Sequence, residues 1–476
     1  MDNSLKKYNE ERIKFWDNIY SKNPRGNFFS NSYHKRLVEI INFIIPENAK
    51  VLETGCGTGD LLAKINSNNK TGIDFSGEAI KIAKTKYPDI KFIEADVQNF
   101  DFAGLNQKFD YIILSDLVND LYDIQKALEN IRPVCNDNTK LIINFYSRVW
   151  GWTLKLGEIA GLKKKNLEQN WITVTDIKGL LDLSGFEMIK SWHEILLPAN
   201  IPLLNPFFNK FLVRIFPFNH LSLTNFVIAR PKPKAKKEYS VSIVVPARNE
   251  AGNIKNILDR TNKLGKETEL IFVEGNSTDN TYEIIQKEIH SYNKLSVTLI
   301  KQSGKGKGNA VREGFKIAKG DLLMILDADL TVPPEKLSNF YDALASGTGE
   351  FINGVRLVYP MDEKAMRFFN FMGNKFFSAA FSWLLGQPIK DTLCGTKVLF
   401  KSDYEKIAAQ RSYFGNFDPF GDFDLIFGAA KLNLKMIDLP IRYKERTYGE
   451  TNIQRWKHGW LLFKMVFFAA RKIKFK

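Results

Sequence analysis

Short apolar segments that each lead into a turn and then a helical pattern recur along the chain, in two separate halves. Residues 50–52 precede a helical stretch at 60–66, and residues 242–245 precede one at 252–263. Strands and helices that alternate in this way form mostly parallel sheets covered by helices. We therefore predict an α/β protein with two doubly wound domains.

The boundary between the halves is predicted at a basic, proline-containing segment. Residues 231–237 contain two prolines and four lysines. Proline lacks a backbone donor and like charges repel, so this segment should be extended. A chain of 476 residues is also long enough for more than one core. We expect domains at residues 1–230 and 239–476, joined by a linker at 231–238.

Basic side chains exceed acidic ones by 68 to 53, a net charge of +15 that favours anionic partners. Eight of these positive charges lie in two acid-free blocks, residues 231–237 and 471–476. The cations lie beside apolar runs, and they do not belong to a recognisable nucleic-acid-binding module. We therefore expect a membrane surface as partner and not nucleic acid. Three cysteines, an N-terminus unlike a signal peptide and the lack of a 20-residue apolar run predict a cytoplasmic protein.

A glycine-rich turn, Glu53-Thr-Gly-Cys-Gly-Thr-Gly59, follows the first strand of the N-terminal half. Glycines let a ligand approach the strand end and the start of the next helix. The second strand ends at Asp74, about 20 residues on, where a carboxylate can bind ribose hydroxyls. The third ends at Asp96. This order of strand-end signals predicts a nucleoside-binding site.

The series resembles the class I S-adenosylmethionine-dependent methyltransferases over about residues 30–230, with a Rossmann-like methyltransferase fold. The NAD-type fingerprint, Gly-x-Gly-x-x-Gly, has a different spacing. The resemblance implies S-adenosylmethionine as cofactor. Asp74 would bind its ribose, Asp96 its adenine amino group, and the glycine loop its amino-acid end. The implied cofactor-binding residues are Glu53, Gly55, Gly57, Gly59, Asp74 and Asp96.

The motifs identify the methyl donor more clearly than the methyl acceptor. Tyr33, His34, Asp116 and Asp120 are candidates for a catalytic base, with none preferred.

A hairpin of two strands, residues 186–197 and 221–229, should close the first sheet. An apolar insert at 198–220 connects these two strands. A hairpin connection is normally two to five residues long. The insert is therefore interpreted as a lid over an apolar acceptor, as a membrane contact or as packing onto the second domain.

In the C-terminal half, charged turns follow the buried strands. The turns are Pro246-Ala-Arg248-Asn-Glu250, Glu274-Gly-Asn-Ser-Thr-Asp279, the basic Lys305-Gly-Lys307-Gly, and Asp327-Ala-Asp329. A basic glycine-rich turn before a helix favours anions. Two carboxylates separated by one residue can share a divalent cation that also binds a diphosphate. These turns predict a nucleotide-diphosphate site.

The ordered motifs resemble the family 2 inverting glycosyltransferases of the GT-A fold over residues 239–460, most closely the dolichyl-phosphate mannose and polyprenyl-phosphate glucose synthases. That family commonly has Asp-Asp-Gly where this chain has Glu274-Gly-Asn, which leaves the choice of a UDP- or GDP-linked sugar open. The resemblance implies Mg²⁺ or Mn²⁺ on Asp327 and Asp329. It also implies that the donor is lined by Pro246, Arg248, Glu250, Glu274, Lys305 and Asp327.

Two sugar acceptors remain open. A phosphate acceptor needs cations to position it, and the resemblance suggests Arg356, Arg367 and Lys397. A hydroxyl acceptor needs a carboxylate base, for which Asp424 or Asp422 is the candidate. Arg455 would act as a cationic clamp on the diphosphate in either case.

Apolar segments at 368–386 and 460–468, the latter followed by the basic tail, are typical of helices lying in a membrane interface. Ordinary core helices are the alternative. We predict a bifunctional enzyme, peripheral on the cytoplasmic membrane face. It would transfer a sugar to a polyprenyl-phosphate or glycolipid acceptor and would methylate a molecule of the same pathway. The alternative is transfer to a sugar hydroxyl, with the methyltransferase-like half a non-catalytic binding module.

Overall fold

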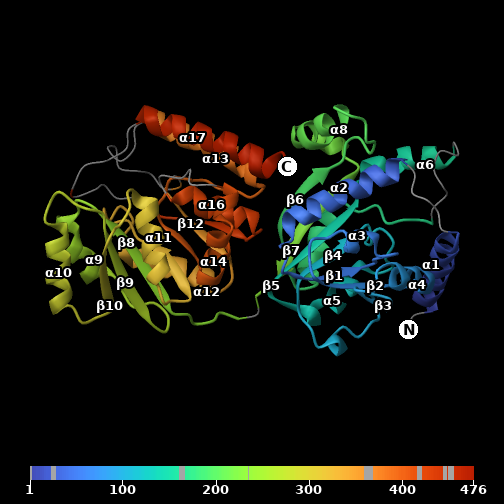
Figure 1. Cartoon of the computed structure of the whole chain (residues 1–476), viewed down its shortest axis with the longest axis horizontal. Coiled ribbons are helices and arrows are strands. Elements are labelled where there is room, and N and C mark those ends of the chain that lie inside the picture. The colour runs from blue at the N-terminus through green and yellow to red at the C-terminus, as the bar shows by residue number, and fades with distance from the viewer. Residues whose placement is uncertain are drawn as a thin grey trace. The chain divides into compact units, whose positions relative to one another are not determined.

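The computed structural model describes residues 3–22, 28–159, 167–233, 235–356, 358, 368–414, 421–442, 448 and 455–476. Two compact units make up the chain, residues 1–232 and 233–474, and each is built on one seven-stranded sheet (Figure 1). Both sheets carry helices between their strands. The predicted α/β class with two doubly wound domains is confirmed.

The sheet of the first unit has the order β3-β2-β1-β4-β5-β7-β6. Strands β1 to β5 are parallel, and β7 runs antiparallel to both of its neighbours. The carboxyl ends of β1 to β4 therefore share one edge. The strands are β1 (Lys50–Thr54), β2 (Asn69–Asp74), β3 (Lys91–Glu94), β4 (Phe109–Ser115), β5 (Cys135–Tyr146), β6 (Phe186–Glu194) and β7 (Thr224–Pro231).

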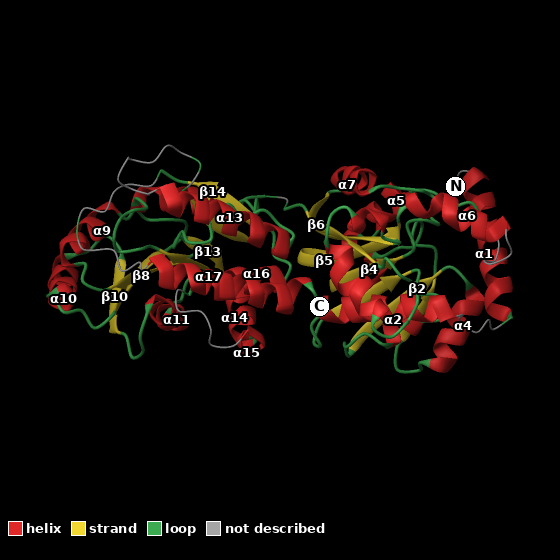
Figure 2. Ribbon diagram, turned by 90° about the horizontal axis from the view of Figure 1, so that it is seen from above, coloured by secondary structure: helices red, strands yellow, loops and turns green. Residues whose placement is uncertain are grey.

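Helices cover both faces of this sheet because successive strand residues point to opposite faces. Ile112 of β4 packs in the cluster that includes α5 and α7, whereas Ile113 packs in the cluster that includes α2 and α4. Figure 2 shows α5 and α7 on one side of the strands and α2 and α4 on the other. The helices are α1 (Asn3–Ser21), α2 (Phe28–Ile44), α3 (Asp60–Ala63), α4 (Gly77–Lys86), α5 (Ile124–Asn130), α6 (Gly151–Ile159), α7 (Val174–Leu183) and α8 (Leu204–Pro206).

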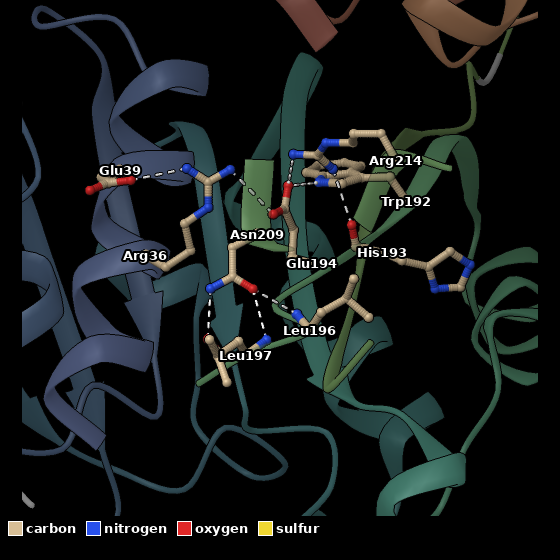
Figure 3. A network of polar contacts seen from close by, with 9 residues as sticks. All are labelled: Arg36, Glu39, Trp192, His193, Glu194, Leu196, Leu197, Asn209 and Arg214. Carbon is tan, nitrogen blue, oxygen red and sulfur yellow. Dashed lines mark hydrogen bonds and ion pairs between the residues drawn. The ribbon is translucent and has the colours of Figure 1, made fainter. Parts of the chain in front are cut away.

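The predicted hairpin is β6 and β7, and the chain between them forms α8 and short helical turns. Buried polar contacts attach this insert to the end of β6 (Figure 3). Asn209 accepts the backbone N–H groups of Leu196 and Leu197 at 2.8 and 2.9 Å. Glu194, 1% exposed, pairs with Arg214 of the insert and with Arg36 of α2.

The second sheet has the order β10-β9-β8-β11-β13-β12-β14, with β13 antiparallel to both neighbours and the other pairs parallel. The carboxyl ends of β9, β8, β11 and β12 and the start of β13 lie at one edge. The strands are β8 (Val241–Ala247), β9 (Thr268–Glu274), β10 (Ser296–Lys301), β11 (Leu322–Ile325), β12 (Phe351–Val355), β13 (Lys397–Phe400) and β14 (Met436–Pro440).

Two apolar clusters again lie on opposite faces of the sheet, since Ile243 of β8 belongs to one and Val244 to the other. Helices α9, α10 and α12 pack in the first, and α11, α13, α14, α16 and α17 in the second. The helices are α9 (Ile254–Arg260), α10 (Thr281–Ser291), α11 (Lys307–Ile317), α12 (Leu337–Ala345), α13 (Phe368–Leu385), α14 (Lys401–Ala409), α15 (Arg411–Phe414), α16 (Asp422–Lys431) and α17 (Arg455–Ala469).

Helices α13 and α17 pack side by side and have two different faces. Phe381 of α13 and Met465 of α17 are buried in the core. Large apolar side chains on the other face are exposed: Met372, Phe376, Trp383, Trp460, Phe463 and Phe467. Among the described residues, none of the helices combines the length and the hydropathy that a bilayer span needs.

The segment predicted as a linker is partly engaged in structure. Pro231 ends β7 and lies opposite Phe186 of β6. Within the second unit, the Nζ of Lys236 lies 2.7 Å from Oδ1 of Asp342, and the N–H of Lys237 donates to the carbonyl of Ala345.

Candidate functional sites

The glycine-rich turn of the first unit is tied to the end of β2. Gly55, Gly57 and Gly59 all have positive φ angles, which side-chain-bearing residues rarely adopt. The carboxylate of Asp74 accepts the Gly57 N–H at 2.7 Å and the Ser76 N–H at 2.9 Å. Burial raises the pKa of Asp74 to about 6, although these hydrogen bonds act in the opposite direction. Asp74 thus fixes the shape of the turn.

A pocket opens beside this turn, where the carboxyl ends of the neighbouring strands β1 and β2 meet the chain that follows β3. Of the six predicted cofactor residues, Gly55, Asp74 and Asp96 line it, whereas Glu53, Gly57 and Gly59 do not. Apolar side chains complete the walls around the acids: Ile73, Phe75, Val97 and Leu117.

Glu53 lies beneath the turn, 2% exposed, and its Oε2 has no hydrogen-bond partner among the described residues. Burial, together with nearby Asp74, raises its pKa well above the ordinary value. Acids at the ends of three neighbouring strands suit a ligand with ribose hydroxyls and amino groups. The residues present therefore fit S-adenosylmethionine.

Helix α1 covers the same pocket, and sequence reasoning assigned it no role. Its Asn9, Arg12 and Ile13 line the pocket. Asn9 Nδ2 donates to Asp96 Oδ2 at 2.7 Å, and Arg12 Nε donates to the carbonyl of Asp120 at 3.1 Å. Asn9, Arg12 and Ile13 recur at helical spacing, and this pattern was the available signal.

Of the four base candidates, Tyr33 and Asp116 meet in a buried cluster at the end of β4. Asp116 Oδ1 accepts the Tyr33 hydroxyl at 2.7 Å and Asn144 Nδ2 at 2.8 Å. Burial raises the pKa of Asp116 to about 7, against the effect of the Tyr33 hydrogen bond. Of the other two candidates, Asp120 lines the pocket. His34 is not among the residues that line this pocket, and burial lowers its pKa.

The predicted donor residues of the second unit follow three adjacent strands. Pro246 lies in β8, and Arg248, which is exposed, follows that strand. Glu274 ends β9 opposite Ala247 of β8, is 3% exposed and accepts the Ser277 N–H at 2.6 Å. Glu250 accepts Asn253 Nδ2 at 2.7 Å, and Lys305 is exposed on the turn before α11.

Asp327 follows β11 and pairs with a lysine that sequence reasoning had left unassigned. The Nζ of Lys307, the first residue of α11, lies 2.5 Å from Asp327 Oδ1. Asp329 Oδ1 accepts the N–H and the hydroxyl of Thr331 at 3.1 and 2.8 Å. The described residues contain no group of three or more His, Cys, Asp or Glu side chains arranged around a metal position. Two carboxylates nonetheless fit Mg²⁺ or Mn²⁺, because such ions take further ligands from substrate phosphates.

The cations expected at the acceptor are already in contact with protein groups. Arg356 follows β12 and forms an ion pair with Asp391, Nε to Oδ2, at 2.7 Å. Lys397 is fully buried and donates to the carbonyl of Cys394. Arg367 lies outside the described residues.

Asp424, the preferred candidate base, is 7% exposed and paired with Arg411 at 2.8 Å, with Arg312 3.9 Å away. The side chains of Asp422 and Arg455 are outside the described part of the structure. The roles of these residues stay predictions.

Two families match separate parts of the chain. Residues 45–196 match the family described as a methyltransferase domain, and residues 242–408 match glycosyl transferase family 2.

Two curated relatives resemble the second unit. The undecaprenyl-phosphate 4-deoxy-4-formamido-L-arabinose transferase of Edwardsiella ictaluri is 24% identical over 215 residues, which are 44% of this chain and 62% of that protein. The dolichol-phosphate mannosyltransferase of Saccharomyces cerevisiae is 37% identical over 112 residues, 22% of this chain and 41% of that protein. The chain thus spans less than two thirds of either relative.

Solved structures resemble each part. The magnesium protoporphyrin IX methyltransferase of Synechocystis with bound SAH has 16% identity and a TM-score of 0.33, covering 48% of this chain and 98% of that one. A mannosyltransferase of Pyrobaculum calidifontis, in complex with GDP-Man and Mn²⁺, has 19% identity and a TM-score of 0.34, covering 48% and 61%.

Proposed function

We propose that this chain, which joins a methyltransferase domain to a family 2 glycosyltransferase domain, builds a methylated glycoconjugate on a membrane. The second unit, residues 239–476, transfers a sugar from a UDP- or GDP-linked donor to a polyprenyl-phosphate or glycolipid acceptor, with inversion. The first, residues 1–230, methylates a molecule of the same pathway from S-adenosylmethionine, and residues 231–238 link the two. The observation that carries the proposal is the gathering of Glu274, Asp327 and Lys307 at the edge of one sheet.

In this mechanism the protein binds the donor at the ends of β8, β9 and β11 and leaves its anomeric carbon open to attack from the opposite side. Mg²⁺ or Mn²⁺, when bound by Asp327 and Asp329, would stabilise the charge that develops on the leaving diphosphate. Lys307 and the N-terminus of α11 add positive charge for the same phosphates.

A phosphate acceptor has more support than a hydroxyl. The names of both curated relatives include a polyprenyl phosphate, undecaprenyl phosphate in one and dolichol phosphate in the other. A phosphate is already anionic at neutral pH and needs no base. Asp424, the base that a hydroxyl would require, is instead buried against Arg411.

Contact with a membrane is supported by the exposed apolar face of α13 and α17. Trp460, Phe463 and Phe467 are 50–73% exposed on α17, and Lys464 and Arg471 are exposed beside them. Apolar side chains next to cations suit the interface of an anionic bilayer. This face would present the lipid acceptor to the sugar-transfer site.

The first unit has an exposed apolar surface of its own on the insert and α6. Leu203 and Phe216 of the insert are 86% and 75% exposed, and Trp152 of α6 is 80% exposed. No acidic residue occurs between 195 and 229. Of the three interpretations of the insert, contact with a membrane therefore has the most support, and it would bring a lipid-linked methyl acceptor to the cofactor pocket.

The full chain should be assayed with a panel of UDP- and GDP-sugars, Mg²⁺ or Mn²⁺, and undecaprenyl phosphate. We expect nucleotide release that depends on the lipid and is lost in Asp327→Asn. Failure of every donor would contradict the glycosyltransferase proposal.

For the first unit, calorimetry should show binding of S-adenosylmethionine that Asp74→Asn weakens. No binding would leave that unit a non-catalytic module.

Membrane contact should be tested by sedimentation with phosphatidylglycerol vesicles. The double variant Trp460→Ser/Phe467→Ser should bind at least about tenfold more weakly, because two large apolar side chains no longer leave water. Ile317→Ser is the matched control, since Ile317 is also exposed (40%) but lies on α11. Equal binding of both variants would contradict the proposed membrane face.

A further inference from the structure

We propose that Lys307 is an internal counter-ion that holds Asp327 in the empty enzyme, so that the divalent metal binds together with the nucleotide and not before it. This inference rests on the proposed function, in which Asp327 is a metal ligand. It assigns Lys307 a positioning role that changes between the empty and the donor-bound site.

The ion pair occupies a site shaped for it. Lys307 Nζ lies 2.5 Å from Asp327 Oδ1, with the side chains 30% and 23% exposed. The backbone of Gly395 closes against both partners. A Cβ atom at Gly395 would lie 1.9 Å from Asp327 Oδ2 and 2.2 Å from Lys307 Nζ. The pair is therefore fitted against the chain at the start of β13, unlike a chance surface contact.

The turn that carries Lys307 is braced from behind. Gln302 Nε2 donates to the carbonyl of Gly306 and to Asn309 Oδ1, both at 2.8 Å, and the Gly304 N–H donates to the same Asn309 oxygen at 3.1 Å. The backbone is held by these bonds, while the ammonium group stands at the end of a flexible stem. Lys307 can therefore change partner without a change in the turn.

The location of Lys307 favours such an exchange. A cation is disfavoured at a helix N-terminus, and Lys307 is the first residue of α11. Asp327 offsets this cost in the empty site. A diphosphate bound at the same helix end would offer Lys307 a second anion and would release Asp327 for the metal.

The consequence is a coupling between two ligands. Without nucleotide, a divalent cation must displace the Lys307 ammonium group from Asp327. The cation and the ammonium group then lie close together, and their like charges repel. With nucleotide, the phosphates attract both cations. Metal and nucleotide should each strengthen the binding of the other by the same factor.

The test is Mn²⁺ binding to the full chain, followed by electron paramagnetic resonance with and without UDP or GDP. In the unmodified protein we expect weak binding that nucleotide strengthens at least tenfold. In Lys307→Met, binding without nucleotide should become at least tenfold tighter and the strengthening by nucleotide should shrink. Lys307→Arg retains the charge and should retain the coupling. Lys316→Met, an exposed lysine of the same helix, should behave as the unmodified protein.

The inference would be overturned if Lys307→Met and Lys316→Met bound Mn²⁺ with equal affinity in the absence of nucleotide. The proposed function would still stand in that case, provided that nucleotide strengthens Mn²⁺ binding to the unmodified protein. A chain that turns over donor but binds no Mn²⁺ or Mg²⁺ under any condition would overturn the metal role of Asp327 and this inference with it. Thermal unfolding of each variant confirms that the proteins compared are folded.

Discussion

Arg356 meets Asp391 through two parallel contacts, Nε to Oδ2 at 2.7 Å and Nη2 to Oδ1 at 2.8 Å, and the carboxylate is fully buried. Burial alone would raise the pKa of Asp391, but the charge and hydrogen bonds of Arg356 outweigh it and hold the pKa below its ordinary value. The arginine expected to bind an acceptor phosphate is thus also a structural partner of a buried acid.

Arg356→Ala should destabilise the second unit by about 3–5 kcal/mol, because it leaves a buried carboxylate without its partner. Urea unfolding measures this change. Arg260→Ala removes one partner of the more exposed pair with Glu335 and should cost less than about 1 kcal/mol. If Arg356→Ala were as stable as Arg260→Ala and yet inactive, a direct role at the acceptor would be favoured instead.

Asp116→Asn should stabilise the first unit increasingly as the pH rises. Burial raises the pKa of Asp116 from 3.8 to about 7, so the folded state holds this proton more tightly than the unfolded state. Ionisation between these two values therefore costs stability, by at most about 1.4 kcal/mol per pH unit. Urea unfolding at pH 5 and pH 8 should show a larger gap between variant and parent at pH 8. Asp101→Asn, at an exposed aspartate of the same unit, is the matched control.

Gly395→Ala should lower donor turnover at least about tenfold, because the new methyl group would displace the carboxylate of Asp327, the proposed metal ligand, from its place beside residue 395. The side chains of Asp327 and Lys307 are partly exposed and can turn outward, so the melting temperature should change little. Gly179→Ala is the control, since no atom lies within 4 Å of a Cβ there. Turnover equal to that of the control would show that the spacing at residue 395 is unimportant for the donor.

Glu194→Ala should destabilise the first unit by about 3–5 kcal/mol, because Arg36 and Arg214 lose their shared buried carboxylate. It should also speed proteolysis within residues 198–220. Glu39→Ala removes the exposed partner of the same Arg36 and should cost less than about 1 kcal/mol. Equal effects of the two substitutions would argue against Glu194 as the anchor of the insert.

Strand-end residues were predictable because their position follows from local pattern. Asp74 ends β2 and Asp96 follows β3, and both line one pocket. In the other sheet Glu274 ends β9 and Asp327 follows β11, and only β8 lies between these two strands. A parallel sheet brings its strand ends to one edge whatever the intervening loops contain. The two α/β folds and the hairpin around the insert could be predicted for the same reason.

Partners that meet through packing were not predictable. The contact of Asn9 with Asp96 joins residues 87 positions apart, and it depends on how α1 folds back over the sheet. The burial of α13 and α17 was not predictable either. The sequence indicates either core helices or helices in a membrane interface, whereas in the structure each helix has one buried and one exposed face. Pairing and burial of this kind are set by tertiary structure, and periodicity alone does not carry that information.

The attachment of the insert to β6 bears on how such an enzyme could change its substrate. β6 is the outermost strand of its sheet, separated by β7, β5 and β4 from the strands that end in the cofactor acids. The segment is held there by a joint of four residues, which are Arg214 and Asn209 of the insert, Glu194 at the end of β6 and Arg36 of α2. A different segment carrying the same joint could be grafted between β6 and β7 without altering the pocket, so acceptor selectivity and cofactor use could evolve, or be engineered, independently.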